Sequence, residues 1–287
     1  TMTYLLAASL LWAFSFGLIK GQLSGLDPVA VSCVRLLLAF AVFAPVLVRR
    51  PLASRTAVRA LLLGVLQFGL MYVLYITSYR WLPAWMVALF TIFTPLYVVL
   101  FSDALERRFR PWHLAAALLA VGGAAVVVVG AMPAGADWRG IVLLQGANLC
   151  FAVGQVLFVG LKNEGDAAEA SLLGWMYLGA AGFTLLVVVV RLAGGIQPLA
   201  GWHRWTWWAL LYLGVLPTGL GFYLWNKGAA RVGAGVLAVA NNLKIPLAVL
   251  VSWLVFREEA AYGRVLVGLA VIVGALFLAR PRRGAKS

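Results

Sequence analysis

Residues 211–224, LYLGVLPTGLGFYL, repeat residues 61–74, LLLGVLQFGLMYVL, at a constant offset of 150 positions. Eight of the fourteen residues are identical between the two stretches. Three pairs of landmarks follow in the same order while the offset drifts to 152, namely Pro95 and Pro246, Glu106 and Glu258, and Gly122 and Gly274. An ordered series of Gly, Pro and Glu positions is harder to obtain by chance than a match between leucine-rich helices. We therefore expect the chain to consist of two related halves.

The composition is that of a membrane protein. Of the 287 residues, 64% are hydrophobic and 11% are charged, and the mean hydropathy is +0.98. An ordinary soluble domain is about a quarter charged. The net charge of +14 comes mainly from residues between apolar runs, where lysine and arginine set topology and contact anionic lipid. The expected partners are therefore the lipid bilayer and a small-molecule substrate, and no nucleic acid is expected.

Apolar runs recur along the chain, each near the length that a bilayer demands. The ten expected spans are 3–20, 28–48, 58–79, 84–102, 111–130, 138–161, 170–191, 205–227, 234–256 and 263–280. The first span lacks a basic amino-terminal region and a small-residue cleavage site, so we expect it to be a retained helix. The predicted fold class is an all-α polytopic membrane protein with ten transmembrane helices, and no soluble domain fits between them.

Five spans fall in each half, 1–134 and 135–287. Because five is odd, the second half must enter the membrane from the opposite face. Such inverted repeats are typical of transporters, whose substrate site lies near the midplane between the halves. Fourteen lysines and arginines lie on the side of the two termini and seven on the other side. This bias predicts that both termini are cytoplasmic.

The ninth expected span, 234–256, carries a charge in its middle. Lys244 lies about ten residues, or about 15 Å of helix, from either end, which is too deep for its stem to reach a headgroup. The nine acidic residues all lie in connections or at span ends. An ionisable group at this depth usually faces a cavity or a partner. We expect Lys244 to bind an anionic substrate group such as a carboxylate; neutralisation by helix-end carbonyls is the alternative.

Two asparagines precede this lysine. Asn241 is three residues before Lys244 and shares its face at helical spacing, so it is the better candidate for a substrate ligand. Asn242 points away by roughly 200°. We expect Asn242 to bond a neighbouring helix, as buried amides do in membranes.

Prolines interrupt the fourth and ninth spans. Pro95 and Pro246 each remove one backbone donor and free a carbonyl one turn earlier. The resulting kinks either gate the pathway or are static. Thr94, beside Pro95, is the repeat counterpart of Lys244, so the charge is present in one half only. An asymmetric substrate requires such asymmetry.

Aromatic side chains form a stripe on the third span. Tyr72, Tyr75 and Tyr79 are spaced three and four residues apart and share one face. An aromatic stripe of this kind more often serves packing, but tyrosine hydroxyls need partners in hydrocarbon, which makes the wall of a wet cavity the alternative. The further candidates for the substrate pocket are Trp12, Phe16, Trp85, Asn148, Gln155, Trp175 and Tyr223. Arg35 lies about seven residues inside the second span, and we expect it to snorkel or to bind lipid.

Motifs for catalysis are missing. The sequence has no phosphate loop, zinc-ligand spacing or nucleophile elbow, so we expect neither an enzyme nor a cofactor or metal site. Cys33 and Cys150 both fall within apolar spans and are expected to be small buried hydrophobic residues. Two five-helix halves make a single chain self-sufficient, which favours a monomer.

The chain resembles the drug/metabolite transporter superfamily, EamA type. The resemblance covers nearly the whole chain and rests on the two five-helix repeats, Pro95 and Pro246, and the glutamates that follow in Leu-Glu-Arg-Arg (105–108) and Arg-Glu-Glu (257–259). Within the family, the chain is most similar to the bacterial exporters of aromatic amino acids. The resemblance implies a bacterial inner-membrane protein that exports small amphipathic metabolites, amino acids included, by alternating access. The lack of a mid-membrane carboxylate disfavours the usual proton relay and favours facilitated diffusion.

Other transporter functions stay open. Related nucleotide-sugar carriers have a Gly-Ala-Leu-Asn-Lys motif in the ninth helix, where this chain reads Val-Ala-Asn-Asn-Leu-Lys (239–244). An antiporter of phosphorylated sugars or nucleotide sugars would need several cations in its pocket. A multidrug exporter for cations would need a membrane carboxylate. A lipid flippase would show a lateral opening to the bilayer.

Overall fold

The computed structural model describes residues 2–23, 25–82, 87, 90–128, 137–165, 167–247 and 262–279. All regular structure in these residues is helical. The main elements are α1 (Met2–Gln22), α2 (Pro28–Arg49), α3 (Ser54–Gly64), η1 (Val65–Leu70), α4 (Met71–Ser78), α6 (Thr94–Leu105), α7 (Pro111–Val128), α8 (Trp138–Asn163), α9 (Glu169–Ala193), α10 (Arg204–Leu213), η3 (Gly214–Gly221), α11 (Phe222–Ala229), α12 (Ala234–Asn241) and α14 (Tyr262–Leu278). The two elements η1 and η3 are π-helical.

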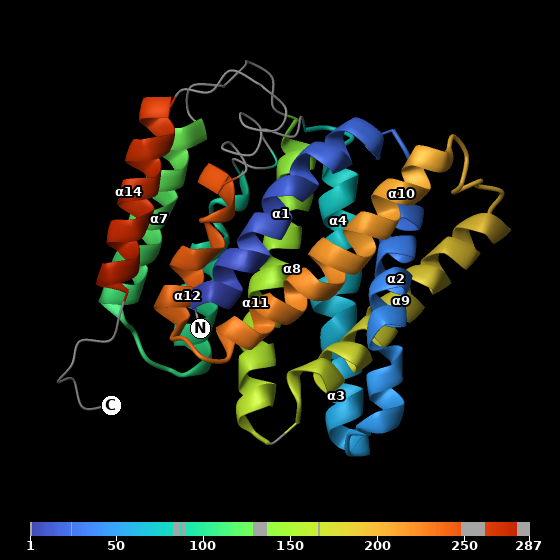
Figure 1. Ribbon diagram of the computed structural model, residues 1–287, viewed down its shortest axis with the longest axis horizontal. Coiled ribbons are helices and arrows are strands. Elements are labelled where there is room, and N and C mark those ends of the chain that lie inside the picture. The colour runs from blue at the N-terminus through green and yellow to red at the C-terminus, as the bar shows by residue number, and fades with distance from the viewer. Residues whose placement is uncertain are drawn as a thin grey trace.

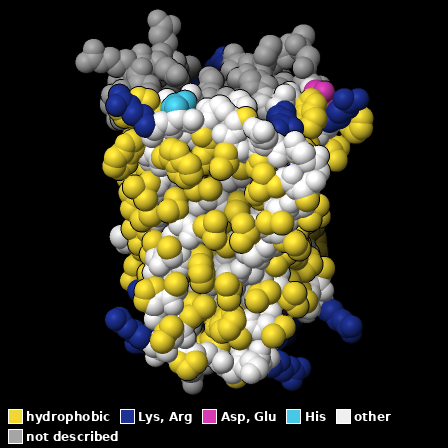
Figure 2. Space-filling model, turned by 90° about the vertical axis from the view of Figure 1, so that its right-hand side faces the viewer, with side chains coloured by type: hydrophobic (Ala, Val, Ile, Leu, Met, Phe, Trp, Pro, Cys, Tyr) yellow, Lys and Arg dark blue, Asp and Glu magenta, His cyan; other side chains and the backbone are white. Residues whose placement is uncertain are grey.

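The helices form one bundle with a membrane-facing flank. In Figure 1, α7 and α14 lie side by side at one edge, while α2, α3 and α9 pack together at the other. Hydrophobic side chains cover the flank of the bundle, and lysines and arginines gather at its two ends (Figure 2). This arrangement matches the apolar middle and polar rims of a bilayer. The chain is therefore an all-helical membrane protein.

Five described helical stretches are long and apolar enough to cross a membrane: Pro28–Arg49, Ser54–Ser78, Trp138–Asn163, Glu169–Ala193 and Arg204–Ala229. Each coincides with an expected span. Shorter apolar helices occupy parts of the other expected spans, at Met2–Ser15, Thr94–Leu105, Pro111–Val126, Ala234–Leu247 and Leu266–Leu278. The described residues thus include part of every expected span, and the total of ten remains a prediction.

A π-helical segment interrupts two of the long spans at matching positions. Val65–Leu70 lies within Ser54–Ser78, and Gly214–Gly221 lies within Arg204–Ala229. Both segments fall in the repeated stretches, 150 residues apart. The sequence predicted the spans but not these π turns, which loosen the regular hydrogen-bond ladder. The coincidence supports the proposal that the two halves are repeats.

Glycines let these interrupted spans approach neighbouring helices closely. A Cβ atom added at Gly64 would overlap the carbonyl oxygen of Met176 in α9. At the matching position, a Cβ atom on Gly214 would lie 2.7 Å from the Cβ atom of Leu38 in α2. Both glycines therefore allow close helix contact, as small residues do in membrane bundles.

The helical runs that carry the two prolines are broken rather than merely kinked. Residues 92–93 and 242–243 form turns between helical residues, again 150 positions apart. Pro95 and Pro246 lie in the first turn of the helical residues that follow, two and three positions after these turns. Helix breaks at membrane depth are tolerated where protein surrounds them or a cavity adjoins them, and in transporters they commonly border the substrate site.

Candidate functional site

A cavity lies where these broken helices meet the helices of both halves. It holds about 640 Å³ of space between atoms, part of which is open to the surroundings. Its wall includes residues from the first half, such as Trp12 and Tyr72, and residues from the second, such as Phe222 and Lys244. The described wall contains two cations, Arg35 and Lys244, and no aspartate or glutamate.

Six of the residues predicted for the substrate site line this cavity: Trp12, Tyr72, Tyr75, Thr94, Asn148 and Lys244. They come from α1, α4, α6, α8 and the residues after α12. Spans far apart in sequence therefore deliver the predicted lysine, tyrosines and asparagine to one space. The side chain of Phe16 and the whole of Trp85 lie outside the described residues.

Lys244 sits just beyond the break in the ninth span. Its Nζ lies 3.4 Å from Oδ1 of Asn241 and 5.7 Å from the centroid of the Trp12 ring. The carboxyl end of α12 and the ring face both favour a cation. Among the described residues, no carboxylate forms an ion pair with this ammonium. Lys244 is therefore positioned by neutral groups.

Arg35 is the main site residue that the sequence analysis missed. The prediction that it snorkels or binds lipid is wrong: its exposed fraction is 2% and it lines the cavity. Its Nη2 donates to the Tyr72 hydroxyl at 3.2 Å and to Oγ1 of Thr218 at 3.0 Å. Its Nε and Nη1 have no hydrogen-bond partner among the described residues.

A signal for Arg35 was present in the sequence. Ser32, Leu36, Ala39 and Phe43 of α2 are all buried, and they recur at helical spacing on the stripe that includes Arg35. The distance from the span end suggested snorkelling, but the face of the helix decides where a side chain points. Small residues such as Ser32 and Ala39 mark that face as a contact with other helices.

Asn242 joins the two broken helices. Its Nδ2 donates to the carbonyl oxygens of Ile92, at 3.1 Å, and Ala120, at 3.3 Å. Ile92 lies in the break of the fourth span, 150 positions before Asn242. The prediction that Asn242 bonds a neighbouring helix is confirmed.

Asn148 connects α8 to the fourth span beside the cavity. Its Nδ2 donates to the Phe90 carbonyl at 3.0 Å, and Nε2 of Gln145 donates to the same oxygen at 3.1 Å. The Tyr97 hydroxyl in turn donates to Oε1 of Gln145 at 2.8 Å. Gln145 was not predicted, although its position three residues before Asn148 places it on the same helical face.

Thr94 also acts on the fourth span. Its Oγ1 donates to the Thr91 carbonyl at 2.8 Å. That carbonyl lies four residues before Pro95, which has no N–H to bond it. Thr94 thus satisfies the group freed by the proline while lining the cavity.

Two predicted residues lie beside the cavity without lining its described wall. Asn241 is buried and contacts Lys244. The hydroxyls of Tyr79 and Tyr75 are 2.8 Å apart and share a hydrogen bond. These residues therefore position two that do line the cavity.

Three further predicted residues are placed elsewhere. Oε1 of Gln155 accepts a hydrogen bond from Nε1 of Trp225 at 2.6 Å, so this amide joins α8 to α11. The Tyr223 hydroxyl accepts from Nζ of Lys227 at 3.3 Å. Trp175 packs against the hydrophobic core. Helical spacing alone could not distinguish residues that contact another helix from residues that line the cavity.

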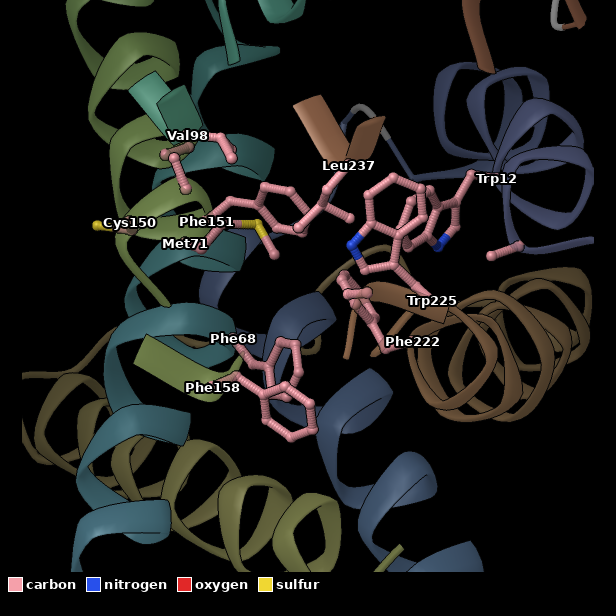
Figure 3. Packing of buried hydrophobic residues seen from close by; sticks show 14 of the residues in the cluster. Trp12, Phe68, Met71, Val98, Cys150, Phe151, Phe158, Phe222, Trp225 and Leu237 are labelled. Carbon is pink, nitrogen blue, oxygen red and sulfur yellow. The ribbon is translucent and has the colours of Figure 1, made fainter. Parts of the chain in front are cut away.

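Aromatic rings form a large part of the apolar wall. The Trp12 ring lies 5.0 Å from both the Phe222 and Trp225 rings and 6.4 Å from the Phe151 ring, centroid to centroid. Figure 3 shows Trp12, Trp225 and Phe222 gathered on one side, with Phe151 and Met71 opposite. Aromatic faces of this kind bury the apolar body of a small ligand.

A helical membrane bundle with a cationic cavity lined by aromatic rings is typical of one class of protein, the membrane transporters of small molecules. The family model described as the EamA-like transporter family matches residues 1–129 and 138–280. The chain belongs to this family, as the sequence resemblance predicted. The two matched segments correspond to the two expected halves, which supports the proposed repeat.

Two relatives that align with nearly the whole chain are both named as biotin transporters. The chain is 41% identical to a "Probable biotin transporter" of Pseudomonas aeruginosa over 284 residues, 97% of each chain. It is 34% identical to a "Biotin transporter" of Escherichia coli over 281 residues, 97% of this chain and 93% of the relative. An "Aromatic amino acid exporter YddG" of Ancylobacter novellus is 27% identical over 203 residues, 70% of this chain and 68% of the relative.

The fold also occurs among solved structures. One crystal structure superposes with a TM-score of 0.77 at 21% sequence identity, covering 96% of this chain and 95% of the other. At this identity the likeness concerns the fold alone. It supports the arrangement of helices on which the cavity depends.

Proposed function

We propose that this protein transports a small monocarboxylate with an uncharged body, and that biotin is its substrate. The observation that carries the proposal is the partly buried Lys244 on the cavity wall, whose hydrogen-bond partner among the described residues is the neutral Asn241. A cation held by neutral groups inside a membrane is poised for an anion. The relatives named biotin transporters, at 41% and 34% identity, support the choice.

The chemistry of biotin matches the cavity group by group. Its carboxylate suits the ammonium of Lys244. Its ureido ring carries N–H donors and a carbonyl acceptor, which suit the amide of Asn148 and the hydroxyls of Tyr75 and Thr94 on the cavity wall. Its apolar ring system suits the faces of Trp12 and Phe222. Each part of the ligand thus exchanges water for a matching protein group.

Aromatic amino acids are the second candidate. The aromatic wall and the relative named as an aromatic amino acid exporter favour them. Their ammonium group, however, needs an acceptor, and the described wall of the cavity contains no carboxylate. Export of amino acids, the function expected from the sequence resemblance, therefore takes second place to transport of a net anion.

The proposed mechanism is alternating access by facilitated diffusion. Two inverted halves would rock about the cavity, with the breaks at 92–93 and 242–243 as the places where each half can bend. The described aspartates and glutamates lie at helix ends or in connections, so they offer no proton relay through the middle of the membrane. Transport would follow the substrate gradient in either direction, with both termini in the cytoplasm.

The test uses purified protein in proteoliposomes and measures their uptake of labelled biotin from outside. We expect the wild type to equilibrate biotin, and Lys244→Met to slow uptake about tenfold or more, because a charge-assisted hydrogen bond is lost. Lys162→Met, which removes one charge at the end of α8, is the matched control and should behave as the wild type. Normal biotin uptake by Lys244→Met would overturn the assignment of that residue.

Three additional measurements separate the alternatives. Labelled phenylalanine and glucose phosphate should enter much more slowly than biotin. If either one enters faster than biotin, the protein is a transporter of that substrate class instead. An imposed pH difference should leave the final biotin level unchanged. Accumulation of biotin above its outside concentration would contradict facilitated diffusion and show proton coupling.

A further inference from the structure

Arg35 and Trp12 are both anchored on the π-helical segment η3. Nη2 of Arg35 donates to Oγ1 of Thr218 at 3.0 Å, and Nε1 of Trp12 donates to the carbonyl oxygen of Pro217 at 3.0 Å. Pro217 and Thr218 are consecutive residues. The guanidinium and the indole are therefore held at one point of the second half, although both belong to the first.

The same anchor brings the two cations of the cavity together. Lys244 lies over the Trp12 ring, with Nζ 5.7 Å from its centroid, and Arg35 is fixed at the residue next to the one that Trp12 bonds. Both cations line the same cavity, and its described wall offers no carboxylate. Two positive charges on the wall of one cavity create a positive potential in it, because the surrounding protein has a low dielectric constant.

The hydrogen bonds of Arg35 leave it free to meet a ligand. The Tyr72 hydroxyl and Thr218 occupy Nη2, and the Tyr72 ring lies under the guanidinium, with Cζ 4.5 Å from its centroid. Nε and Nη1 are buried and have no partner among the described residues. Buried guanidinium donors without partners are costly, and an anion in the cavity would satisfy them.

We infer that Arg35 is a specificity-determining residue, which with Lys244 makes the cavity select net-anionic ligands over neutral and zwitterionic ones. This inference rests on the proposed function and gives the charge class of its substrate. A carboxylate without a nearby ammonium is attracted by both cations. An amino acid brings the same carboxylate but places its own cation in the same positive field, where nothing on the described wall neutralises it.

The test compares ligands that differ only in charge. Biotin is paired with biotinamide, in which a neutral amide replaces the carboxylate, and 3-phenylpropanoate is paired with phenylalanine, which adds an ammonium. Each ligand competes with labelled biotin on the full-length protein in lipid nanodiscs. The wild type should bind biotin and 3-phenylpropanoate about tenfold or more tightly than their partners.

The variants separate specificity from structure. Arg35→Gln should reduce the preference for biotin over biotinamide about tenfold while biotinamide still binds, and Arg35→Lys should retain most of the preference. Tyr72→Phe keeps the ring and removes one anchor, so it should lower the preference in the same direction by less. Arg139→Gln, which removes an exposed charge from the first turn of α8, is the control and should leave the preference unchanged.

Each contrary outcome has its own meaning. An unchanged preference in Arg35→Gln, or an equal loss of biotin and biotinamide binding, would overturn the inference. If Arg35→Gln does not fold, an unchanged preference in Tyr72→Phe would do the same. If the wild type binds no biotin, the proposed function fails, and thermal stabilisation by 3-phenylpropanoate over phenylalanine still decides the charge preference.

Discussion

At the scale of single residues, the two buried amides of the ninth span have different tasks. Asn241 contacts Lys244 through Oδ1 at 3.4 Å. Asn242, one residue later, turns to the other side and bonds the carbonyls of Ile92 and Ala120. One asparagine therefore contacts the cavity lysine, and the other bonds neighbouring helical segments.

Substituting these two asparagines should separate binding from stability. Asn242→Ala should lower the free energy of unfolding by about 1–2 kcal/mol, since it removes two hydrogen bonds between buried groups. Asn241→Ala should weaken biotin binding and change stability less. Thermal unfolding in detergent and biotin uptake, measured on both variants, check this. The same loss of stability in both variants would contradict the division of roles.

At the scale of elements, the packing of α3 against α9 depends on missing side chains. A Cβ atom at Gly64 would overlap the Met176 carbonyl oxygen, and one at Gly179 would overlap the Leu61 carbonyl oxygen. The two glycines thus bring the helix backbones together from both sides. Since backbone atoms cannot turn aside as a flexible side chain can, this interface tolerates no added methyl group without a shift of the helices.

Two glycines of α9 provide a matched comparison. Gly179→Ala should destabilise the protein by about 1–3 kcal/mol, because the new methyl group meets the α3 backbone. Gly182→Ala, three residues later on the same helix, faces open space with no atom within 4 Å. It should keep the unfolding temperature or raise it slightly, because alanine favours the helix over glycine. Equal effects of the two substitutions in thermal unfolding would refute the packing argument.

At the scale of the whole molecule, ion pairs join separate helices at both ends of the bundle. Asp27 pairs with Arg191 at 2.8 Å at one end. Arg59 pairs with Glu164, and Arg231 with Glu169, at the other. The Arg59 guanidinium lowers the pKa of the Glu164 carboxyl, so any stability from this pair is present at neutral pH and is lost as the pH falls through that lowered pKa. The pair is exposed, and water and salt weaken it.

The proposed topology can be tested with introduced cysteines. The natural thiols, Cys33 and Cys150, are buried and should give little background labelling. In intact cells, a membrane-impermeant maleimide should label Gln197→Cys, in the connection after α9, and should miss Lys162→Cys, at the end of α8. After permeabilisation both should react. The reverse pattern in intact cells would place the termini outside the cytoplasm.

Sequence reasoning reached the fold because its signals are local. The length and hydropathy of each span reflect the thickness of a bilayer, and the five described long spans lie where they were expected. The depth of Lys244 follows from its position in one apolar run. The match between 61–74 and 211–224 likewise needs only a comparison of the chain with itself.

The site was predicted only in part, because the neighbour toward which a helical side chain points depends on how the helices pack. Six predicted residues line the cavity, whereas Gln155, Trp175 and Tyr223 share the same polar or aromatic character and contact other helices. Distance from a span end misplaced Arg35, which Tyr72 and Thr218 hold inside the bundle. Gln145 and the π turns likewise depend on partners in other helices.

The amino-acid sequence by itself determined that this chain is a helical membrane protein with a lone deep lysine, and it predicts two related halves. Hydropathy, charge bias and internal repetition are properties of the linear chain, because each apolar span enters the bilayer according to its own length and composition. Only the tertiary structure decided that Lys244 shares its cavity with Arg35. That pairing depends on η3, where Pro217 and Thr218 orient groups from α1 and α2. Contacts between spans nearly 200 residues apart arise from packing, which no single span encodes.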